Sequence, residues 1–382
     1  MSKKIGIFTG FFLPHLGGVE RYTDKLATAL KNIGYEVVII TTNHGNLKPH
    51  ETISGHTIYR LPVYNIGKNR YPIIKANQKY KYLLNKISEE KLDYYIINTR
   101  FYITSLIGSK LGRLNNKPVI LIEHGTGHFT VNNIVLDFFG HLYEHFFTNL
   151  VKKNVNKFYG VSKSSNDWAR HFGINSSGVF YNSINKSDER MASDKYINKY
   201  PAGDIVIVYV GRLIKEKGIL NLLTAFNSLS ADLKHTVRLV VAGDGKLLPV
   251  IKQKFNRDNI DILGKLSFED VMALYKRADI FVNPSQYPEG LPTSVLEAGL
   301  MGCAVIATPQ GGTKEIIDST SGNGIMVDGS VEQLIESMEL LIKNDKIRAK
   351  MSEKLREKVI MEFDWDKNVI KVDEAIKEFS LL

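Results

Sequence analysis

Short apolar runs alternate with amphipathic segments along most of the chain. The runs are continuous and rich in β-branched residues, which is typical of strands buried on both faces of a parallel sheet. They cover residues 5–10, 35–42, 93–99, 117–125 and 157–162 in the first half, and 204–211, 237–245, 259–264, 279–285 and 303–309 in the second. This alternation of strand and helix predicts an α/β chain with two doubly wound parallel sheets.

Two of the intervening segments carry clear helix signals. The first helix is expected to end at Gly34, and its apolar face is formed by Val19, Tyr22, Leu26, Leu30 and Ile33. A later helix is predicted to open at Ser267, because Asp270 follows three residues on, close to a capping box.

The apolar pattern lapses over residues 183–204, which are polar. We therefore predict an N-terminal domain over residues 1–185, a linker over 186–204 and a C-terminal domain over 205–365. The 382 residues are enough for two domains that each bury a core. Doubly wound sheets bind ligands at the carboxyl ends of their strands, so we expect the ligand in a cleft between the domains.

The net charge of +10 is unevenly distributed. Residues 1–186 hold 24 Lys and Arg against 11 Asp and Glu, whereas residues 187–382 hold 26 against 29. Nine of the ten histidines also lie in the first half. The resulting +13 of the first half favours an anionic partner for the N-terminal domain.

Two segments of this half could meet an anionic membrane surface. Residues 68–91 hold seven Lys and Arg against two Glu with tyrosines interleaved, and residues 134–153 are rich in aromatics and end in two lysines. The alternatives are a solvated basic helix for the first segment and a core helix for the second. We expect no nucleic-acid partner, because the chain has no RNP, KH or zinc-finger pattern.

The lengths of the apolar runs and the cysteine count argue against a membrane-spanning or disulfide-bonded protein. No apolar run approaches the roughly 18–20 residues that span a bilayer. The apolar stretch after Lys4 is interrupted by Gly10 and Pro14, which favours a first strand over a signal peptide. Cys303 is the single cysteine, so an intramolecular disulfide is excluded and a buried small residue is expected. These features indicate a cytoplasmic protein.

Three loops at predicted strand ends carry residues suited to a phosphorylated ligand. Gly17 and Gly18 allow the backbone to approach an anion at a helix start, or form only a tight turn. Arg212 and Lys217 follow the strand 204–211 and suit a diphosphate, although the pair could equally face solvent. The turn at 243–245, Gly-Asp-Gly, could lie beside a planar ligand or simply join a strand to a helix.

The segment 283–302 has the most informative pattern. Glu289 lies in a loop rich in Gly and Pro, and Glu297 follows in a helix predicted to begin near Thr293. The first N–H groups of that helix would face an anion. The two carboxylates can accept hydrogen bonds from the hydroxyls of a ribose and of a second sugar.

Taken together, these motifs resemble the retaining glycosyltransferases of family 4, which have the GT-B fold. The resemblance covers nearly the whole chain and rests on Gly17-Gly18, Gly211-Arg212-Leu213 with Lys217-Gly218, Gly243-Asp244-Gly245, and EGLPTSVLEAGLMG with its two glutamates. It implies two Rossmann-like domains that face each other across a cleft. It also implies a C-terminal helix, residues 366–382, that packs back on the N-terminal domain.

The resemblance assigns a role to each motif. Arg212 and Lys217 hold the donor diphosphate, and Glu297 binds the nucleotide ribose. Glu289 and His124 lie beside the transferred sugar, at the reaction centre. Further donor contacts are expected from Gly17, Gly18, Gly243 and Gly290. Because Pro292 has no backbone N–H, amide contacts to the phosphate are expected from Leu291, Thr293 and Ser294.

No metal and no cofactor are expected at this site, since lysine and arginine already supply positive charge beside the diphosphate. Asp364 and Asp366 have D-x-D spacing but stand before a helical run, where a carboxylate typically caps the helix. His124 and His128 are separated by two glycines, which disfavours a helical zinc pair.

The expected activity is transfer of a sugar from a nucleotide diphosphate-sugar, such as a UDP-sugar, to a hydroxyl of a glycan or lipid-linked glycan. The expected setting is bacterial surface polysaccharide synthesis, on the inner face of the cell membrane. Two alternatives stay open: a nucleotide-sugar hydrolase or 2-epimerase on the same fold, and a non-catalytic nucleotide-sugar-binding subunit.

Overall fold

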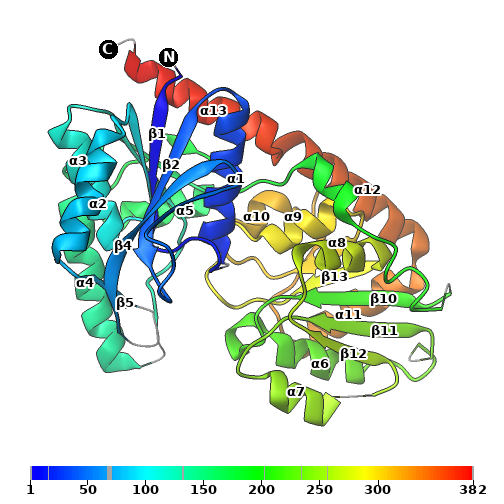
Figure 1. Ribbon diagram of the computed structural model, residues 1–382. Helices are drawn as coiled ribbons and strands as arrows, with labels where there is room; N and C mark the ends of the chain where they lie inside the picture. Colours follow the sequence, from blue (N-terminus) through cyan, green and yellow to red (C-terminus); the bar gives the residue numbers. More distant parts are fainter. Residues whose placement is uncertain are drawn as a thin grey trace. The chain divides into compact units, whose positions relative to one another are not determined.

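The computed structural model describes residues 2–15, 17–66, 71–130, 133–201, 203–233, 235–255 and 257–380 (Figure 1). Lys68 and Arg70, in the basic stretch, lie outside the described residues. The chain divides into two compact units. Unit 1 contains residues 1–182 and 365–382, and unit 2 contains residues 183–364.

The described part of unit 1 forms a nine-stranded sheet in the order β3-β4-β2-β1-β6-β7-β8-β9, with β5 paired to β4. All pairs are parallel except those that β3 and β5 make with β4. The strands are β1 (Lys4–Phe8), β2 (Glu36–Asn43), β3 (His50–Ile53), β4 (His56–Ile66), β5 (Tyr71–Ile74), β6 (Tyr94–Asn98), β7 (Val119–Glu123), β8 (Lys157–Gly160) and β9 (Gly178–Val179).

The apolar runs predicted as strands in unit 1 correspond to β1, β2, β6, β7 and β8. Their side chains are almost all buried, as expected for strands covered on both faces. The helices of the unit are α1 (Gly18–Asn32), α2 (Gln78–Glu89), α3 (Ile103–Leu114), α4 (Ile134–Lys152), α5 (Lys163–Arg170) and α13 (Trp365–Lys377). Helix α1 buries Tyr22, Leu26 and Leu30, and Gly34 follows it with a positive φ of 101°.

Helix α13 is the last helix of the chain and belongs to unit 1. Its Trp365 is buried against the ring of Tyr22 on α1, at 5.1 Å between ring centroids. The hydroxyl of Tyr35 also donates a hydrogen bond to Asp373, at 2.6 Å. An aromatic contact and a hydrogen bond therefore hold α13 against α1 and the turn that follows α1.

Unit 2 contains a fully parallel six-stranded sheet in the order β12-β11-β10-β13-β14-β15 within its described residues. The strand order turns at β10 and β13, and this turning point is where doubly wound sheets bind ligands. The strands are β10 (Ile205–Val210), β11 (Val237–Ala242), β12 (Ile260–Gly264), β13 (Ile280–Asn283), β14 (Ala304–Ala307) and β15 (Ile325–Met326).

Seven α-helices accompany this sheet among the described residues (Figure 1). They are α6 (Ile219–Asn227), α7 (Leu248–Phe255), α8 (Phe268–Arg277), α9 (Thr293–Leu300), α10 (Thr313–Ile316), α11 (Val331–Lys343) and α12 (Asp345–Glu362). Ser267 caps α8 by accepting a hydrogen bond from the backbone N–H of Asp270, as its sequence predicts. Cys303 is completely buried at the start of β14.

Two features differ from the expectations. Strands β4 and β5 lie in a region where no strand was predicted, because Arg60 and Pro62 interrupt the apolar run of β4. Residues 186–204, expected as a linker, lie within unit 2. There Tyr200 is buried and its hydroxyl donates to Asp261 at 2.9 Å, so tyrosines anchor a segment that looked polar.

Candidate active site

Arg212, Lys217 and Glu289 come together at the carboxyl edge of the unit 2 sheet. Arg212 follows β10, and Lys217 ends the 3₁₀ turn Lys215–Lys217 that leads into α6. The Nζ of Lys217 makes an ion pair with Glu289 Oε1. The ring of Tyr287 lies 5.1 Å from the guanidinium carbon of Arg212 and 5.2 Å from Lys217 Nζ. One tyrosine ring is therefore shared by both cations.

The loop that carries Glu289 is fixed from below by buried hydroxyls. Ser285, completely buried, donates to Glu289 Oε1 at 3.1 Å and accepts from the backbone N–H of Tyr287 at 3.2 Å. The hydroxyl of Thr308 donates in turn to the carbonyl oxygen of Ser285. The carboxylate is thus held in place by a chain of hydrogen bonds that starts in the sheet.

Glycine is required where this loop meets its neighbour. Gly311 has a φ of 52°, and a Cβ there would lie 1.5 Å from the carbonyl oxygen of Glu289. The backbone N–H of Gly312 donates to the carbonyl of Gly290 at 3.0 Å. Only a residue without a side chain permits this approach, which sets the height of Glu289 above the sheet.

The glycines of the turn after β11 also allow that turn to approach the backbone of the loop after β10 closely. A Cβ on Gly243 would lie 1.8 Å from the carbonyl oxygen of Gly211, and one on Gly245 would lie 2.5 Å from that of Leu213. The backbone N–H of Leu213 donates to the backbone carbonyl oxygen of Asp244 at 2.8 Å. This turn therefore supports the loop that carries Arg212, which accounts for both glycines.

Helix α9 begins at Thr293, where the sequence predicted a helix start. Pro292 is its N-cap residue and offers no donor, so the first N–H groups of the helix belong to Thr293, Ser294 and the residues that follow. Glu297 lies in the next turn and is 6% exposed. Leu291 is buried beside the helix start.

In unit 1, His124 stands directly after β7, at the carboxyl edge of its sheet. Its Nε2 lies 3.1 Å from Asn98 Oδ1 at the end of β6, and the Nδ2 of the same amide donates to Thr23 at 2.8 Å. Because the amide oxygen can only accept, His124 Nε2 carries the proton and Nδ1 carries the lone pair. The ring also packs edge-on against Tyr22, at 4.7 Å.

Burial lowers the pKa of His124 to about 4, against the opposing effect of the Glu123 and Glu20 carboxylates. The ring is therefore neutral at pH 7. This places a neutral hydrogen-bonding group, rather than an imidazolium, at the edge of the sheet.

Gly17 and Gly18 open α1 at the same edge of the unit 1 sheet. Gly17 is the N-cap residue in an extended conformation, and a Cβ on it would meet only the end of the Glu20 side chain. No atom lies within 4 Å of a Cβ placed on Gly18. The helix start therefore has open space in front of the backbone of Gly18.

Sequence reasoning missed three side chains that build these sites. Tyr287 lies two residues before Glu289, and its position between two cations has no sequence signal. Ser285 ends the predicted strand 279–285, where a buried hydroxyl after an apolar run could have indicated a support for the loop. Asn98 stands in the same way at the end of the run 93–99, where its polarity marks the edge of the sheet.

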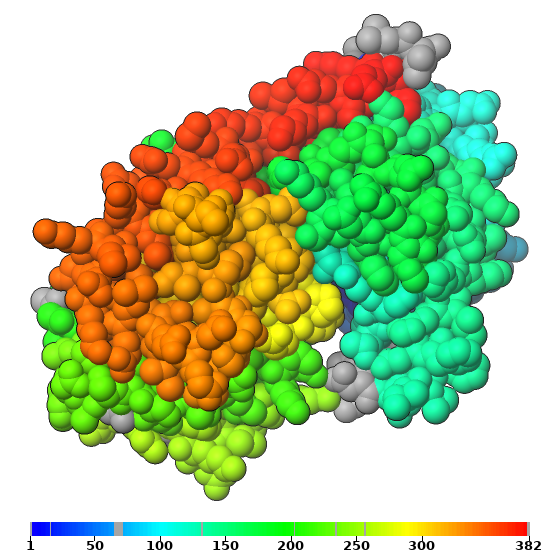
Figure 2. Space-filling view, turned by 180° about the vertical axis from the view of Figure 1, so that it is seen from behind, coloured from blue at the N-terminus to red at the C-terminus, as the bar shows by residue number. Residues whose placement is uncertain are grey.

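Helix α4 presents a second candidate surface. This helix buries polar side chains and exposes apolar ones, which is the inverse of an ordinary surface helix. Its buried side chains include Glu144 and Thr148. Its outer face is apolar and more than 40% exposed at Ile134, Val135, Leu136, Phe138, Phe139, Leu142, Tyr143 and Phe146. Figure 2 shows this helix on the surface of unit 1, in turquoise. Residues 134–153 are thus not a core helix whose aromatic side chains point inward.

The described part of the basic stretch, residues 71–91, carries exposed lysines and tyrosines. Lys79 and Lys81 are exposed on α2, beside Tyr82, which is 59% exposed. Lys75 lies 4.8 Å from the ring of Tyr64, which is also exposed. Among the described residues, no helix is long and apolar enough to cross a membrane.

Comparison with known families accounts for both units. Residues 16–188 match the family described as Glycosyltransferase Family 4, and residues 192–358 match Glycosyl transferases group 1. An uncharacterized glycosyltransferase of Methanocaldococcus jannaschii is 27% identical over 378 residues, which is 96% of each chain. The lipopolysaccharide 1,2-N-acetylglucosaminetransferase of Salmonella typhimurium is 28% identical over 46% of this chain and 48% of its own.

A solved structure gives the same fold. The Anabaena protein HepE in complex with UDP and glucose aligns with a TM-score of 0.77 at 16% identity, over 98% of this chain and 100% of its own. The two family matches follow each other along the chain in the order of its two doubly wound sheets. The chain therefore belongs to the family 4 glycosyltransferases and has the GT-B fold.

Proposed function

We propose that this glycosyltransferase moves a sugar, with retention at the anomeric carbon, from a UDP-sugar to a hydroxyl of a lipid-held glycan. The reaction would need no metal and would serve the synthesis of a surface polysaccharide on the inner face of a bacterial membrane. The observation that carries the proposal is the grouping of Arg212, Lys217 and Glu289 around Tyr287 at the carboxyl edge of β10 and β13.

This grouping suits a leaving diphosphate. When the bond between the anomeric carbon and the phosphate oxygen breaks, negative charge grows on that oxygen. Arg212 and Lys217 supply two fixed positive charges, and the start of α9 adds the N–H groups of Thr293 and Ser294. Lys217 balances the Glu289 carboxylate, and a bound diphosphate would share the ammonium with that carboxylate.

Glu289 and Glu297 suit the hydroxyl-rich ends of the donor. Ser285 holds one oxygen of Glu289 at 3.1 Å, which orients the carboxylate as an acceptor for hydroxyls of the transferred sugar. Glu297 lies one turn into α9, beside the helix start assigned to the phosphates, where it would accept hydrogen bonds from the ribose. The UDP and glucose of the Anabaena structure support a uridine nucleotide as the donor.

The chemical step needs no protein nucleophile. In the same-face displacement that the family resemblance implies, the acceptor oxygen bonds to the anomeric carbon while the phosphate oxygen departs. The acceptor proton passes to that phosphate oxygen, so charge and protons balance. His124 is neutral and donates through Nε2 to Asn98, so its Nδ1 can accept a hydrogen bond from a sugar hydroxyl.

The acceptor is assigned from the surface of unit 1. The exposed apolar face of α4 and the lysines of α2 would hold the enzyme on an anionic membrane. An enzyme that extends a lipid-held glycan gains from this position, because its acceptor is confined to the same plane. The Salmonella relative, a lipopolysaccharide glycosyltransferase by name, supports an acceptor of this class.

A donor panel assayed with and without a lipid-linked acceptor tests the proposal. Release of UDP that depends on the acceptor, with an α-linked product from an α-configured donor, supports it. Equal UDP release without acceptor would indicate a hydrolase, and a changed sugar on the donor would indicate an epimerase. Donor binding without any turnover would indicate a non-catalytic subunit.

A further inference from the structure

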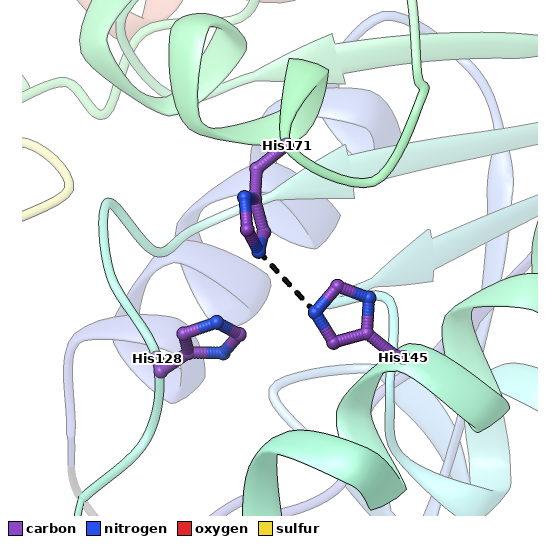
Figure 3. Close-up of side chains that lie close together, drawn as sticks. All are labelled: His128, His145 and His171. Carbon is purple, nitrogen blue, oxygen red and sulfur yellow. Dashed lines mark hydrogen bonds between the residues drawn. The ribbon is translucent and has the colours of Figure 1, made fainter.

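Three histidines from separate segments meet on unit 1, apart from the residues assigned to sugar transfer (Figure 3). His128 lies in the loop between β7 and α4, His145 on α4 and His171 directly after α5. Their rings turn toward one another in Figure 3. Each offers one ring nitrogen, and these three nitrogens lie within 4.8 Å of one another.

The spacing of these nitrogens fits a tetrahedral metal ion. The Nε2 atoms of His145 and His171 are 3.2 Å apart. Zinc bound at about 2.0–2.1 Å by two imidazoles in tetrahedral geometry separates their nitrogens by about 3.3 Å. The pair therefore already has the separation of two zinc ligands, and His128 needs only a small side-chain movement to complete three.

A buried carboxylate orients the third ring. Glu144 Oε2 lies 2.9 Å from His128 Nδ1, and Glu144 Oε1 accepts from the backbone N–H of Phe129 at 2.8 Å. His128 Nδ1 therefore donates to Glu144, which leaves Nε2 with the lone pair that a metal needs. A carboxylate behind a ligating histidine is the usual outer partner of zinc-bound imidazole.

The charge beneath the cluster favours a cation. Arg100 makes ion pairs of 2.8 Å with both Glu123 and Glu144, and all three side chains are buried. One guanidinium faces two carboxylates, so the triad holds a net charge of −1.

We propose that His128, His145 and His171 bind a divalent transition-metal ion, Zn²⁺ in the first place, with water as the fourth ligand. Imidazole is a preferred ligand of zinc, and His171 is exposed, so the ion can enter from solvent. The metal would join the β7–α4 loop, α4 and the end of α5. Its role is to brace the inverted helix α4 from inside, separately from sugar transfer.

Zinc binding by the untagged full-length chain tests the site. After treatment with a chelator, the chain is dialysed against Zn²⁺ and its metal content is measured. The expected result is one zinc per chain. His145→Ala and His171→Ala should each weaken zinc binding at least about tenfold, since even loss of an outer partner costs 10–100-fold. His171 is exposed, so its variant folds even where a buried change does not.

Matched controls keep the result specific. His141→Ala removes a ring stacked 4.0 Å from His128 but no proposed ligand, and His235→Ala removes an exposed histidine of unit 2. Both should bind zinc as the wild type does. Zinc content that is absent in the wild type, or equal in the wild type and the His145 and His171 variants, would overturn the proposal.

Trp168 provides an independent signal. It stacks on His171 with 4.9 Å between ring centroids and 6° between planes, and it meets His128 edge-on at 4.8 Å. Co²⁺ in the site should quench Trp168 fluorescence, and added Zn²⁺ should restore it. Trp168→Phe should remove this signal while zinc content stays at one per chain. Quenching that persists in His171→Ala would place the cobalt elsewhere and count against the site.

Discussion

Arg212 and Lys217 approach the same tyrosine ring but differ in their surroundings. Arg212 is exposed at the end of β10, whereas Lys217 is largely buried by its pairing with Glu289. Loss of Lys217 should therefore remove the proposed contact to the diphosphate and also leave a partly buried carboxylate without its cation. Loss of Arg212 should remove only the proposed contact.

We predict that Arg212→Ala and Lys217→Ala each lower kcat/KM at least tenfold, with Lys217→Ala the more severe. A charge-assisted hydrogen bond contributes about 1.5–3 kcal/mol. Lys215→Ala is the control, because Lys215 is exposed in the same 3₁₀ turn. Steady-state transfer rates measure the effect, and wild-type turnover in both variants would remove the diphosphate assignment.

His124 gives a prediction for the pH dependence of stability. Its pKa is about 4 in the folded chain and 6.5 when unfolded, so the unfolded state binds the proton first on acidification. Stability is therefore fully present above pH 6.5 and falls as the pH falls toward 4. Between pH 7 and 5 the loss should be about 2 kcal/mol.

His124→Gln should remove this part of the pH dependence. Both tryptophans, Trp168 and Trp365, belong to unit 1, so tryptophan fluorescence during urea unfolding reports on this unit alone. The quantity compared is the difference between wild type and variant at pH 7 and at pH 5. Equal pH dependence in the two proteins would contradict the neutral ring.

Sequence reasoning singled out charged residues for the proposed donor site but not the side chains that support them. Arg212 follows β10, Glu289 lies in the loop before α9 and Glu297 lies inside α9, and the sequence pattern predicted each of these three positions. The roles of Tyr287 and Ser285 depend on which loops become neighbours across the sheet. The histidine cluster shows the same limit, since its members come from three segments. The concentration of nine histidines in the first half was its one sequence signal.

At the scale of elements, the strands buried on both faces were predicted well, whereas β3, β4 and β5 on one side of the unit 1 sheet were not. A central strand such as β6 has only apolar positions before its final Asn98, and burial forces that pattern. Strand β4 lies nearer the edge, where Arg60 can be buried because it pairs with Glu51. Helix α4 was ambiguous for a related reason: its apolar side chains fit a core or a membrane equally well.

The exposed face of α4 leads to a prediction about membrane binding. Replacing Phe138, Phe139 and Leu142 with serine should abolish flotation with liposomes, because each buried side chain of this size contributes about 1.5–3 kcal/mol. Loss should occur with both anionic and neutral lipids. Donor binding in unit 2 should stay unchanged.

The lysines near α2 serve as the matched comparison. Changing Lys75, Lys79 and Lys81 to glutamine should weaken flotation by up to about a hundredfold on anionic lipids only, at about 1 kcal/mol each. Added salt should mimic this change. If the α4 variant floats normally but loses self-association in gel filtration, the apolar face joins two copies of the chain instead.

For the whole molecule, the proposed chemistry and the proposed zinc site make separate predictions about metals. Dialysis against a chelator should leave the transfer rate at 25 °C largely intact, because in the proposed mechanism Arg212 and Lys217 supply the positive charge at the diphosphate. The same treatment should lower the melting temperature of unit 1 by removing zinc from the histidine cluster. Activity that vanishes with chelator and returns with Mg²⁺ or Mn²⁺ would show that the transfer step needs a metal.

The two aspartates of the D-x-D motif support this expectation. Asp364 is buried at the last residue of unit 2, where it forms a bridge with Ile184. Asp366 lies in the first turn of α13, where a carboxylate is favoured by the helix dipole. Both positions are explained by the backbone around them.

The assignment of α13 to unit 1 has a consequence for synthesis of the chain on the ribosome. Unit 2 is continuous in sequence, whereas unit 1 is interrupted by it and regains its last helix only after residue 364. Unit 2 can therefore complete its fold before the contact between Tyr22 and Trp365 has formed. At about 5–20 residues per second, the nascent unit 1 stays incomplete for roughly 10–40 s after its sheet has emerged. During that interval its uncovered surface is a natural substrate for chaperones.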